Sequence, residues 1–259
     1  MPQFRKPSVI GSISLGALMI FAFAGAASAQ YTEEFHRTVP ISANGRVSLE
    51  NINGNVTVTG WDRNEVQIDA VKKANEQQKL AEARIEVDAN SDSVHIRTKY
   101  PDRHNNNNPA TVTYQLHVPR AARLEDVDLV NGSLDISGVS GDLKANLVNG
   151  KATIEDLSSR AEISTVNGAI HVDFRSLDSA KDIRLKSVNG SITLGLPPSP
   201  NAELSVSTVN GGITTDFPLQ VQGKFMGRHL DGKLGNGGTR IEISNVNGSV
   251  KIGNAKSSL

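Results

Sequence analysis

Short segments in which apolar and polar residues alternate run through the first half of the chain. In Val56, Thr57, Val58 and Thr59 every second side chain is apolar, the pattern of a strand with one buried face. The alternation predicts strands at residues 46–51, 55–61, 65–71, 83–89, 93–98 and 111–118. Residues 72–81 are polar, rich in helix formers and free of glycine and proline, which predicts one short helix. Residues 101–109 are polar, rich in asparagine and bounded by two prolines, which predicts a loop.

From about residue 124 onward a repeat dominates the pattern. Val-Asn-Gly occurs six times, at intervals of 18, 18, 22, 21 and 37 residues, lengths typical of stacked β-coils. An outlying copy has isoleucine in place of valine. The last interval is about two periods, so we expect residues 217–238 to replace a regular coil with a longer excursion. The repeat residues are Asn53, Gly54, Asn131, Gly132, Asn149, Gly150, Asn167, Gly168, Asn189, Gly190, Asn210, Gly211, Asn247 and Gly248.

Each Asn-Gly predicts a change of chain direction, because this dipeptide readily takes positive φ. Counted from the asparagine, positions −6, −4, −1, +3 and +5 are mainly apolar. The pattern describes two strands, each with one buried face, joined at Asn-Gly. Stacked asparagine amides are expected to form a hydrogen-bonded ladder at that point.

Two architectures fit such a repeat, a row of hairpins and a solenoid. In hairpins Asp128 would face Asp135 and Glu162 would face Asp173, and directly opposed like charges destabilise a strand pair. In a solenoid each Asn-Gly is a corner, which lets the preceding valine turn inward. Position −5 then reads Asp126, Lys144, Glu162 and Arg184, alternating in sign along the stack.

These patterns favour an all-β fold, a single-chain β-solenoid that resembles a parallel β-helix, with an N-terminal strand-rich region and at most one short helix. We expect three segments: 1–29 as a signal peptide, 30–120 as an N-terminal β-rich region continuous with the solenoid, and 121–259 as the Asn-Gly-repeat solenoid. A coil at 241–252 would form an uncapped end and invite self-association.

The first 29 residues have the features of an export signal. A short basic start precedes an apolar core, and Ala27-Ser28-Ala29 before Gln30 matches a signal-peptidase site, so cleavage is expected between Ala29 and Gln30. No later segment is apolar enough to span a bilayer. The predicted location is therefore the periplasm, the cell surface or the medium.

Composition narrows the classes of partner. Without residues 1–29 the chain has 25 basic and 27 acidic residues, a net charge of −2, which argues against a nucleic-acid partner. The chain has no cysteine, so disulfides and thiolate metal sites are excluded.

Several segments resemble a bacterial family of exported proteins of unknown function that are labelled putative adhesins. They are Glu34-Phe35, VSLENINGNVTVTGW from Val47 to Trp61, FPLQV from Phe217 to Val221, LGNGG from Leu234 to Gly238, and ISNVNGSV from Ile243 to Val250. The resemblance spans nearly all of the chain after the signal and implies a β-solenoid fold. It brings no catalytic residues.

Few residues are candidates for catalysis or for binding a metal or cofactor. Glu155, Asp173 and Asp216 share position +6, and paired carboxylates cleave sugars on some β-helices, although a solvated charged face explains them as well. The histidines are scattered, and Gly235, Gly237 and Gly238 read as turn residues. We therefore expect no catalytic, cofactor or metal residues and no cofactor.

The sequence favours a non-enzymatic cell-envelope protein, an adhesin-like binding or scaffolding module. A carbohydrate-active lyase or hydrolase using Glu155 and Asp173 is the first alternative, and a structural assembly subunit is the second. The expected partners are cell-envelope polysaccharide or protein, with self-association as a further option.

Overall fold

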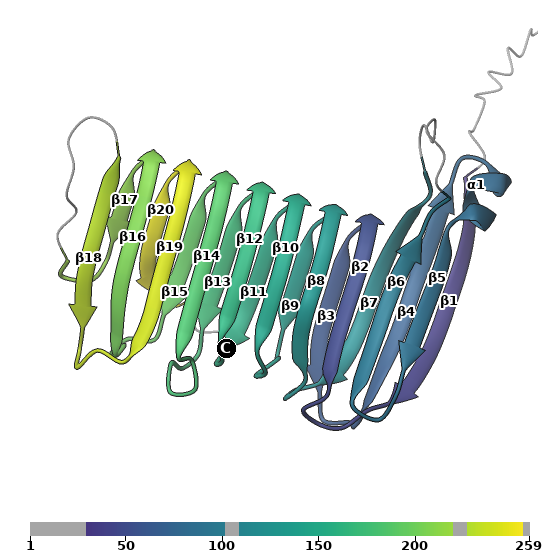
Figure 1. The fold of residues 1–259 in the computed structure, drawn as a ribbon, viewed down its shortest axis with the longest axis horizontal. Helices are drawn as coiled ribbons and strands as arrows, with labels where there is room; N and C mark the ends of the chain where they lie inside the picture. Colours follow the sequence, from purple (N-terminus) through teal and green to yellow (C-terminus); the bar gives the residue numbers. More distant parts are fainter. Residues whose placement is uncertain (1–29, 102–108, 220–226, 256–259) are drawn as a thin grey trace, which may run out of the picture.

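The computed structural model describes residues 30–101, 109–219 and 227–255. The predicted signal segment with Ala29, and the centre of the predicted 101–109 loop, lie outside these ranges. In the described chain two long β-sheets pack face to face and the strands run across the long axis (Figure 1). The predicted all-β solenoid with one short helix is confirmed.

The elements follow in this order along the chain. They are β1 (Tyr31–Pro40), β2 (Arg46–Asn53), β3 (Val56–Trp61), β4 (Glu65–Ala74), α1 (Gln77–Glu82), β5 (Arg84–Ala89), β6 (Ser93–Lys99), β7 (Thr111–Pro119), β8 (Arg123–Asn131), β9 (Leu134–Ser137), β10 (Leu143–Asn149), β11 (Ala152–Leu157), β12 (Ala161–Asn167), β13 (Ile170–Phe174), β14 (Asp182–Asn189), β15 (Ile192–Leu196), β16 (Ala202–Asn210), β17 (Ile213–Thr215), β18 (Arg228–Leu234), β19 (Thr239–Asn247) and β20 (Val250–Asn254).

Each coil contributes one strand to each sheet. Sheet A has the order β1-β4-β7-β3-β9-β11-β13-β15-β20-β17, and sheet B has the order β18-β16-β19-β14-β12-β10-β8-β2-β6-β5. Neighbouring coils are parallel and in register, so Asn149 pairs with Asn131 on one side and Asn167 on the other. The hairpin alternative is therefore wrong for the repeat.

The coils do not stack in sequence order, which corrects the expected position of the last coil. The coil β19–β20 lies between β14–β15 and β16–β17, so Asn247 pairs with both Asn189 and Asn210. The antiparallel strand β18 returns the chain from the far end and makes this insertion feasible. At the other end β2–β3 lies in the same way between β6–β7 and β8–β9. The last coil is thus internal and exposes no end.

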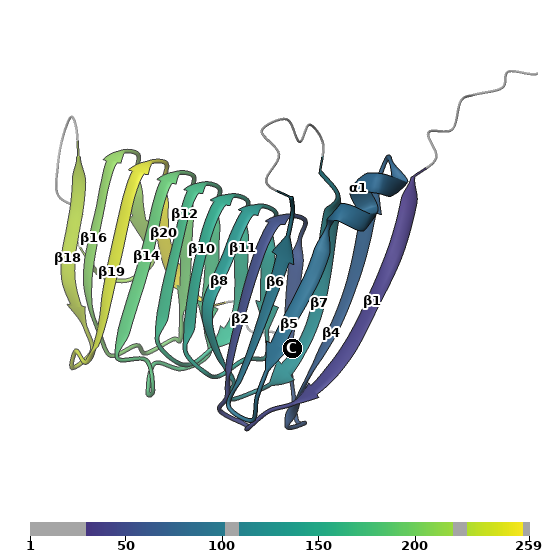
Figure 2. The same cartoon turned by 45° about the vertical axis from the view of Figure 1, so that its right-hand side comes forward.

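Antiparallel strands extend sheet B at one end of the stack and both sheets at the other, while sheet A ends beside β20 in the parallel strand β17. β18 pairs with β16 at one end, while β4, β1 and β5 extend the sheets at the other (Figure 2). The alternation in the sequence does not predict β1, because most of its side chains are polar and exposed.

The helix is shorter than predicted and begins later. Residues 72–74 continue β4, and α1 spans only Gln77–Glu82. Lys72 is buried there, and its ammonium group donates to the carbonyl of Ala83 at 3.2 Å and pairs with Glu33 at 2.7 Å. These partners satisfy the buried charge, so Lys72 can lie in a strand although its polarity suggests an exposed position.

The core is the space between the two sheets, filled by equivalent residues of successive coils. The side chains at position −4 are at most 2% exposed and are Val127, Ala145, Ile163, Leu185, Ile243 and Val206. Burying such side chains contributes roughly 1.5–3 kcal/mol each for the larger ones. The repeated apolar positions therefore supply one continuous core along the whole solenoid.

The predicted charge row at position −5 is present on the outer face of sheet B. Lys144 is in register with Glu162, and Glu162 with Arg184. Lys144 Nζ donates to Asp126 Oδ1 at 2.5 Å, and this hydrogen bond raises the pKa of Lys144. Asp126 itself has a φ of 56° at a bulge in β8, so the row is irregular at that point.

Candidate functional site

A row of exposed apolar side chains runs along the outer face of sheet B. The predicted inward turn of the valine before each asparagine is wrong: these valines and Ile52 are 38–50% exposed. The buried residue is at position −2 instead, as in Leu129 and Leu147, so the strand alternation continues unbroken up to the corner. This valine row, in spatial order, consists of Ile52, Val130, Val148, Val166, Val188, Val246 and Val209.

The valine row contains nearly all exposed large hydrophobic residues of the described chain. Tyr31 is the one other such residue within the described ranges. Adjacent strands lie ~4.8 Å apart, so seven positions span roughly 29 Å. Contiguous exposed apolar residues with polar surroundings mark interaction surfaces more often than scattered ones do.

An asparagine ladder borders the valine row. Each asparagine donates from its side-chain amide to the side-chain oxygen of the next, as Asn149 Nδ2 does to Asn131 Oδ1 at 2.9 Å. The ladder contains Asn53, Asn131, Asn149, Asn167, Asn189, Asn247 and Asn210. A carboxamide has two N–H donors, so each interior amide keeps one N–H for a ligand or solvent.

The expected positive φ at the Asn-Gly corners is present at Gly54 and Gly248, but close stacking of the coils is the requirement that the corner glycines share. No asparagine of the ladder has positive φ; Asp126 and Asp156 are the non-glycine residues with positive φ in the described chain. A Cβ on Gly150 would instead lie 1.9 Å from the carbonyl oxygen of Gly132 in the neighbouring coil. Glycine therefore permits the close stacking of corners, which aligns the valine row and the asparagine ladder.

A groove of about 410 Å³ lies beside the valine row where it crosses β12, β14, β19 and β16. One wall is made of Val166, Val188, Val246 and Val209. The opposite wall is the −3 row, with Ser164, Lys186, Ser244 and Ser207. The groove thus offers apolar contacts along one side and hydroxyl groups with one ammonium group along the other.

The carboxylates singled out in the sequence do not all come together: Asp173 and Asp216 lie over paired glycines of β15 and β20, whereas Glu155 lies elsewhere on sheet A. Asp173 is buried, accepts a hydrogen bond from His171 at 3.1 Å and lies over Gly195. Asp216 lies over Gly253, which is in register with Gly195 on the adjacent strand β20. Glu155 is exposed on β11 and is in register with Ser137 rather than with Asp173.

A cluster that the sequence did not suggest joins Ser48, Glu50, His95 and Arg97 on the outer face of sheet B. Ser48 Oγ lies 2.6 Å from His95 Nδ1, and His95 Nε2 lies 3.5 Å from Glu50. Arg97 only donates, and its Nη2 is 2.9 Å from His95 Nε2. Nε2 is therefore the acceptor and Nδ1 carries the proton, so His95 donates to Ser48. In this arrangement His95 does not activate the serine as a base.

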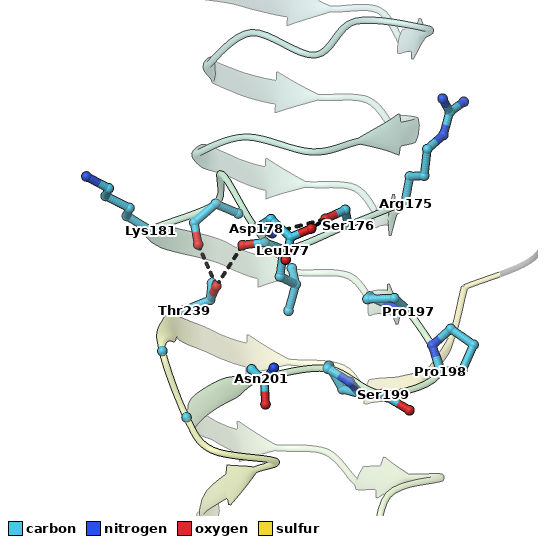
Figure 3. Close-up of a pocket in the computed structure, with 14 residues that line it drawn as sticks. Arg175, Ser176, Leu177, Asp178, Lys181, Pro197, Pro198, Ser199, Asn201 and Thr239 are labelled. Carbon is cyan, nitrogen blue, oxygen red and sulfur yellow. Dashed lines mark hydrogen bonds between the residues drawn. The ribbon is translucent and has the colours of Figure 1, made fainter.

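A larger cavity of about 830 Å³ opens among the loops at the opposite edge of the sheets. Thr239 Oγ1 ties its rim together by donating to the carbonyls of Leu177 and Ala180. Arg175 and Lys181 point away from each other (Figure 3), and Arg175 pairs with Asp156. The cavity therefore lacks charged groups aimed at a common point. Gly237 and Gly238 line it as turn residues with positive φ.

The remaining sequence candidates are dispersed. Trp61 stacks beside His117 at 5.2 Å and beneath Arg63 at 4.8 Å, so its ring is not an open platform. Within the described ranges no three His, Cys, Asp or Glu side chains gather in a group able to hold a metal ion. No helix in those ranges is long and apolar enough to cross a membrane.

Comparison with solved structures places the fold among bacterial proteins. A putative cell adhesion protein from Clostridium sporogenes is 12% identical, with a TM-score of 0.51, and the similarity covers 86% of this chain and all of that one. A putative adhesin from Bacteroides fragilis is 11% identical, with a TM-score of 0.31, and covers 85% of this chain and 97% of its own. The first of these shows the shared fold.

The family comparison covers most of the solenoid. No curated protein matches the chain. The model of the family described as Toastrack DUF4097 matches residues 38–253, from the end of β1 to the last strand. The chain belongs to the Toastrack DUF4097 family.

Proposed function

We propose that this protein is an exported, non-enzymatic module of the cell envelope that binds an extended polymer along the valine row and the asparagine ladder. The observation that carries the proposal is the concentration of exposed apolar side chains in this one row. The signal-like N-terminus supports an envelope location. The description of a solved protein of the same fold as a putative cell adhesion protein agrees with a binding role.

The regular spacing of the row determines the kind of ligand. A chain lying along the row meets one apolar side chain and one carboxamide at every strand, ~4.8 Å apart. An extended polysaccharide has apolar ring faces and hydroxyl groups that repeat along its length, so it can make similar contacts on successive coils. The serine side of the groove offers further hydrogen bonds to the same chain. We therefore favour cell-envelope polysaccharide as the ligand class.

The valine row also has a purely structural explanation that an experiment must separate from binding. Stacked β-branched side chains stabilise neighbouring strands by roughly 0.2–1 kcal/mol per pair. The double variant Val166→Thr/Val188→Thr keeps the branch and shape while removing two exposed methyl groups. It should leave the thermal midpoint nearly unchanged and weaken polymer binding.

The test is co-sedimentation of the purified protein with isolated cell walls and surface polysaccharides. Wild-type protein should sediment with at least one fraction, and Val166→Lys/Val188→Lys should not. The control is Thr153→Lys/Thr193→Lys, the same gain of charge on the two strands of sheet A that flank β13, which should bind as the wild type does. Equal binding by both lysine variants would refute the proposed surface.

The same samples test the enzymatic alternative. Soluble sugar fragments are measured after incubation with the wild type, Glu155→Gln and Asp173→Asn. We expect no release above the level without protein. Release that either substitution abolishes would refute the non-enzymatic function.

A further inference from the structure

The strand β1 forms one end of sheet A and has a free edge. It pairs with β4 along its full length, and no described strand lies beyond it (Figure 2). Such an edge carries unpaired backbone N–H and C=O groups and can pair with another strand. Pro40, which lacks an N–H, occurs only at its last position.

The hydrogen-bonding pattern identifies which residues face the free edge. Ile41 N donates to the carbonyl of Asn64 at 3.1 Å, which continues the β1–β4 register by one residue. Backbone groups alternate in direction along an antiparallel strand, so odd-numbered residues of β1 bond to β4. The N–H and C=O groups of Thr32, Glu34, His36 and Thr38 therefore face outward from the sheet edge.

The sequence of β1 is complementary to itself in one antiparallel register. When Phe35 lies opposite Phe35 of a second copy, Glu34 lies opposite His36, and Glu33 opposite Arg37. The two-fold axis repeats both pairs, which gives four attractive pairs. Residues that face each other in this register also share a face of the sheet, because their numbers have the same parity.

Neighbouring registers are less favourable. Centring the pair on Glu34 places two carboxylates opposite each other, and centring it on His36 places two imidazoles opposite each other. Charged side chains commonly keep edge strands apart. In β1 the order of the charged side chains disfavours the registers centred on Glu34 and His36 and favours the register centred on Phe35.

The side chains at the centre leave room for such a partner. Phe35 is only partly buried although it packs against the core, and most other β1 residues are exposed on the inner face as well. In the register described, the two Phe35 rings form a non-hydrogen-bonded pair, in which side chains approach most closely. Apolar contact at the centre is thus flanked by opposite charges.

We propose that β1 is a homodimerisation strand, and that its free edge pairs antiparallel with β1 of a second copy around Phe35, which joins the two A sheets into one. This goes beyond the proposed polymer binding and does not depend on it, because the valine row lies on sheet B. The dimer would present two valine rows, which strengthens attachment to a long polymer through multivalency.

Charge reversal tests the register. Glu33→Arg and Arg37→Glu each create two like-charged pairs in a homodimer, so each variant alone should dimerise at least ~10-fold more weakly than the wild type. Mixed together, they restore complementary pairs and should form a heterodimer. Sedimentation velocity measures the singles, and native mass spectrometry with one isotope-labelled partner measures the mixture. Glu155→Arg, an equal charge change at a distant strand, should remain a dimer.

Glu33 also pairs with Lys72 within one chain, so its charge reversal could disturb the fold as well as the dimer. A second variant that changes only the backbone at the free edge separates these two effects. Thr38→Pro removes an N–H at the free edge and leaves the bonds to β4 intact. It should weaken dimerisation with an unchanged circular dichroism spectrum. A monomeric wild type, or a dimer that withstands Thr38→Pro or both charge reversals, would overturn the proposal.

Discussion

Gly168→Ala tests how the corners of the solenoid are held together. An added Cβ at this residue would lie 1.8 Å from the carbonyl oxygen of Gly150 and 3.3 Å from Thr165 Oγ1. Real Cβ atoms essentially never approach closer than 3.0 Å, so the two coils must separate locally by about 1.2 Å. The carbonyl cannot rotate away freely, because the corner backbone is part of the parallel ladder.

The expected cost follows from the bonds that this separation strains. Between these coils Gly150 N donates to the Asn167 carbonyl at 3.0 Å, Ala152 N to the Ala169 carbonyl at 2.9 Å, and Asn167 Nδ2 to Asn149 Oδ1 at 2.9 Å. Each hydrogen bond contributes roughly 0.5–1.5 kcal/mol. The free energy of unfolding should therefore fall by about 2–4 kcal/mol, consistent with other overpacked sites.

The matched control is Gly212→Ala, since a Cβ there meets nothing within 4 Å. It should change the free energy of unfolding by no more than about 1 kcal/mol, and in the stabilising direction if the backbone is compatible. Equilibrium urea denaturation followed by circular dichroism measures both variants. Equal midpoints for the two would show that close corner stacking does not constrain the glycine.

Three further predictions concern the outer face and the edge. Asn149→Asp removes the N–H that donates to Asn131 and should lower stability by about 1 kcal/mol in thermal melts; no loss would mean that the ladder contributes nothing to folding. Lys144→Glu breaks the exposed pair with Asp126 and faces Glu162, and should cost up to about 1 kcal/mol at low salt. Adding Glu155→Lys should not restore it, because residue 155 lies on sheet A; full restoration would support the hairpin pairing. The hydrogen bond to Asp69 raises the pKa of His36 and lowers that of Asp69. Because the pKa of His36 is raised on folding, its interaction stabilises the fold fully below pH 6.5, the unfolded value, and this stabilisation is lost as the pH rises through the folded pKa. Because the pKa of Asp69 is lowered on folding, its contribution to stability is lost when the pH falls through the folded pKa. Asp69→Asn should therefore lower the pKa of His36 in an NMR titration, and an unchanged value would contradict the assigned partner.

The repeat spacing predicts the coils but not their order. Rows at equivalent positions have the same chemistry, so a coil can stack on any other coil. The position of β19–β20 between Asn189 and Asn210 depends on the 37-residue interval and on β18, which no periodic signal describes. The sequence does not predict the edge strand β1 because this strand buries few side chains and therefore shows little alternation of apolar and polar residues.

The sequence predicts buried valines at position −1 because this position is more regular than the neighbouring position −2. Position −1 is apolar in every copy, whereas the buried position −2 changes from Leu129 and Leu147 to Thr165, Ser187, Asn245 and Thr208. These polar residues are buried at the corner, where several donate to glycine carbonyls, as Thr208 Oγ1 does to Gly248 at 3.1 Å. Strict alternation from position −4 would have assigned the valines to the surface.

The most direct test of the proposed function is a methyl NMR titration of the protein with the polysaccharide fraction that captures it. Signals of Ile52, Val130, Val148, Val166, Val188, Val246 and Val209 should shift, while buried methyl groups such as Ile163 and Leu185 should change little. Shifts confined to the loop cavity around Leu177, or to residues beside Asp173 on sheet A, would contradict binding along the valine row.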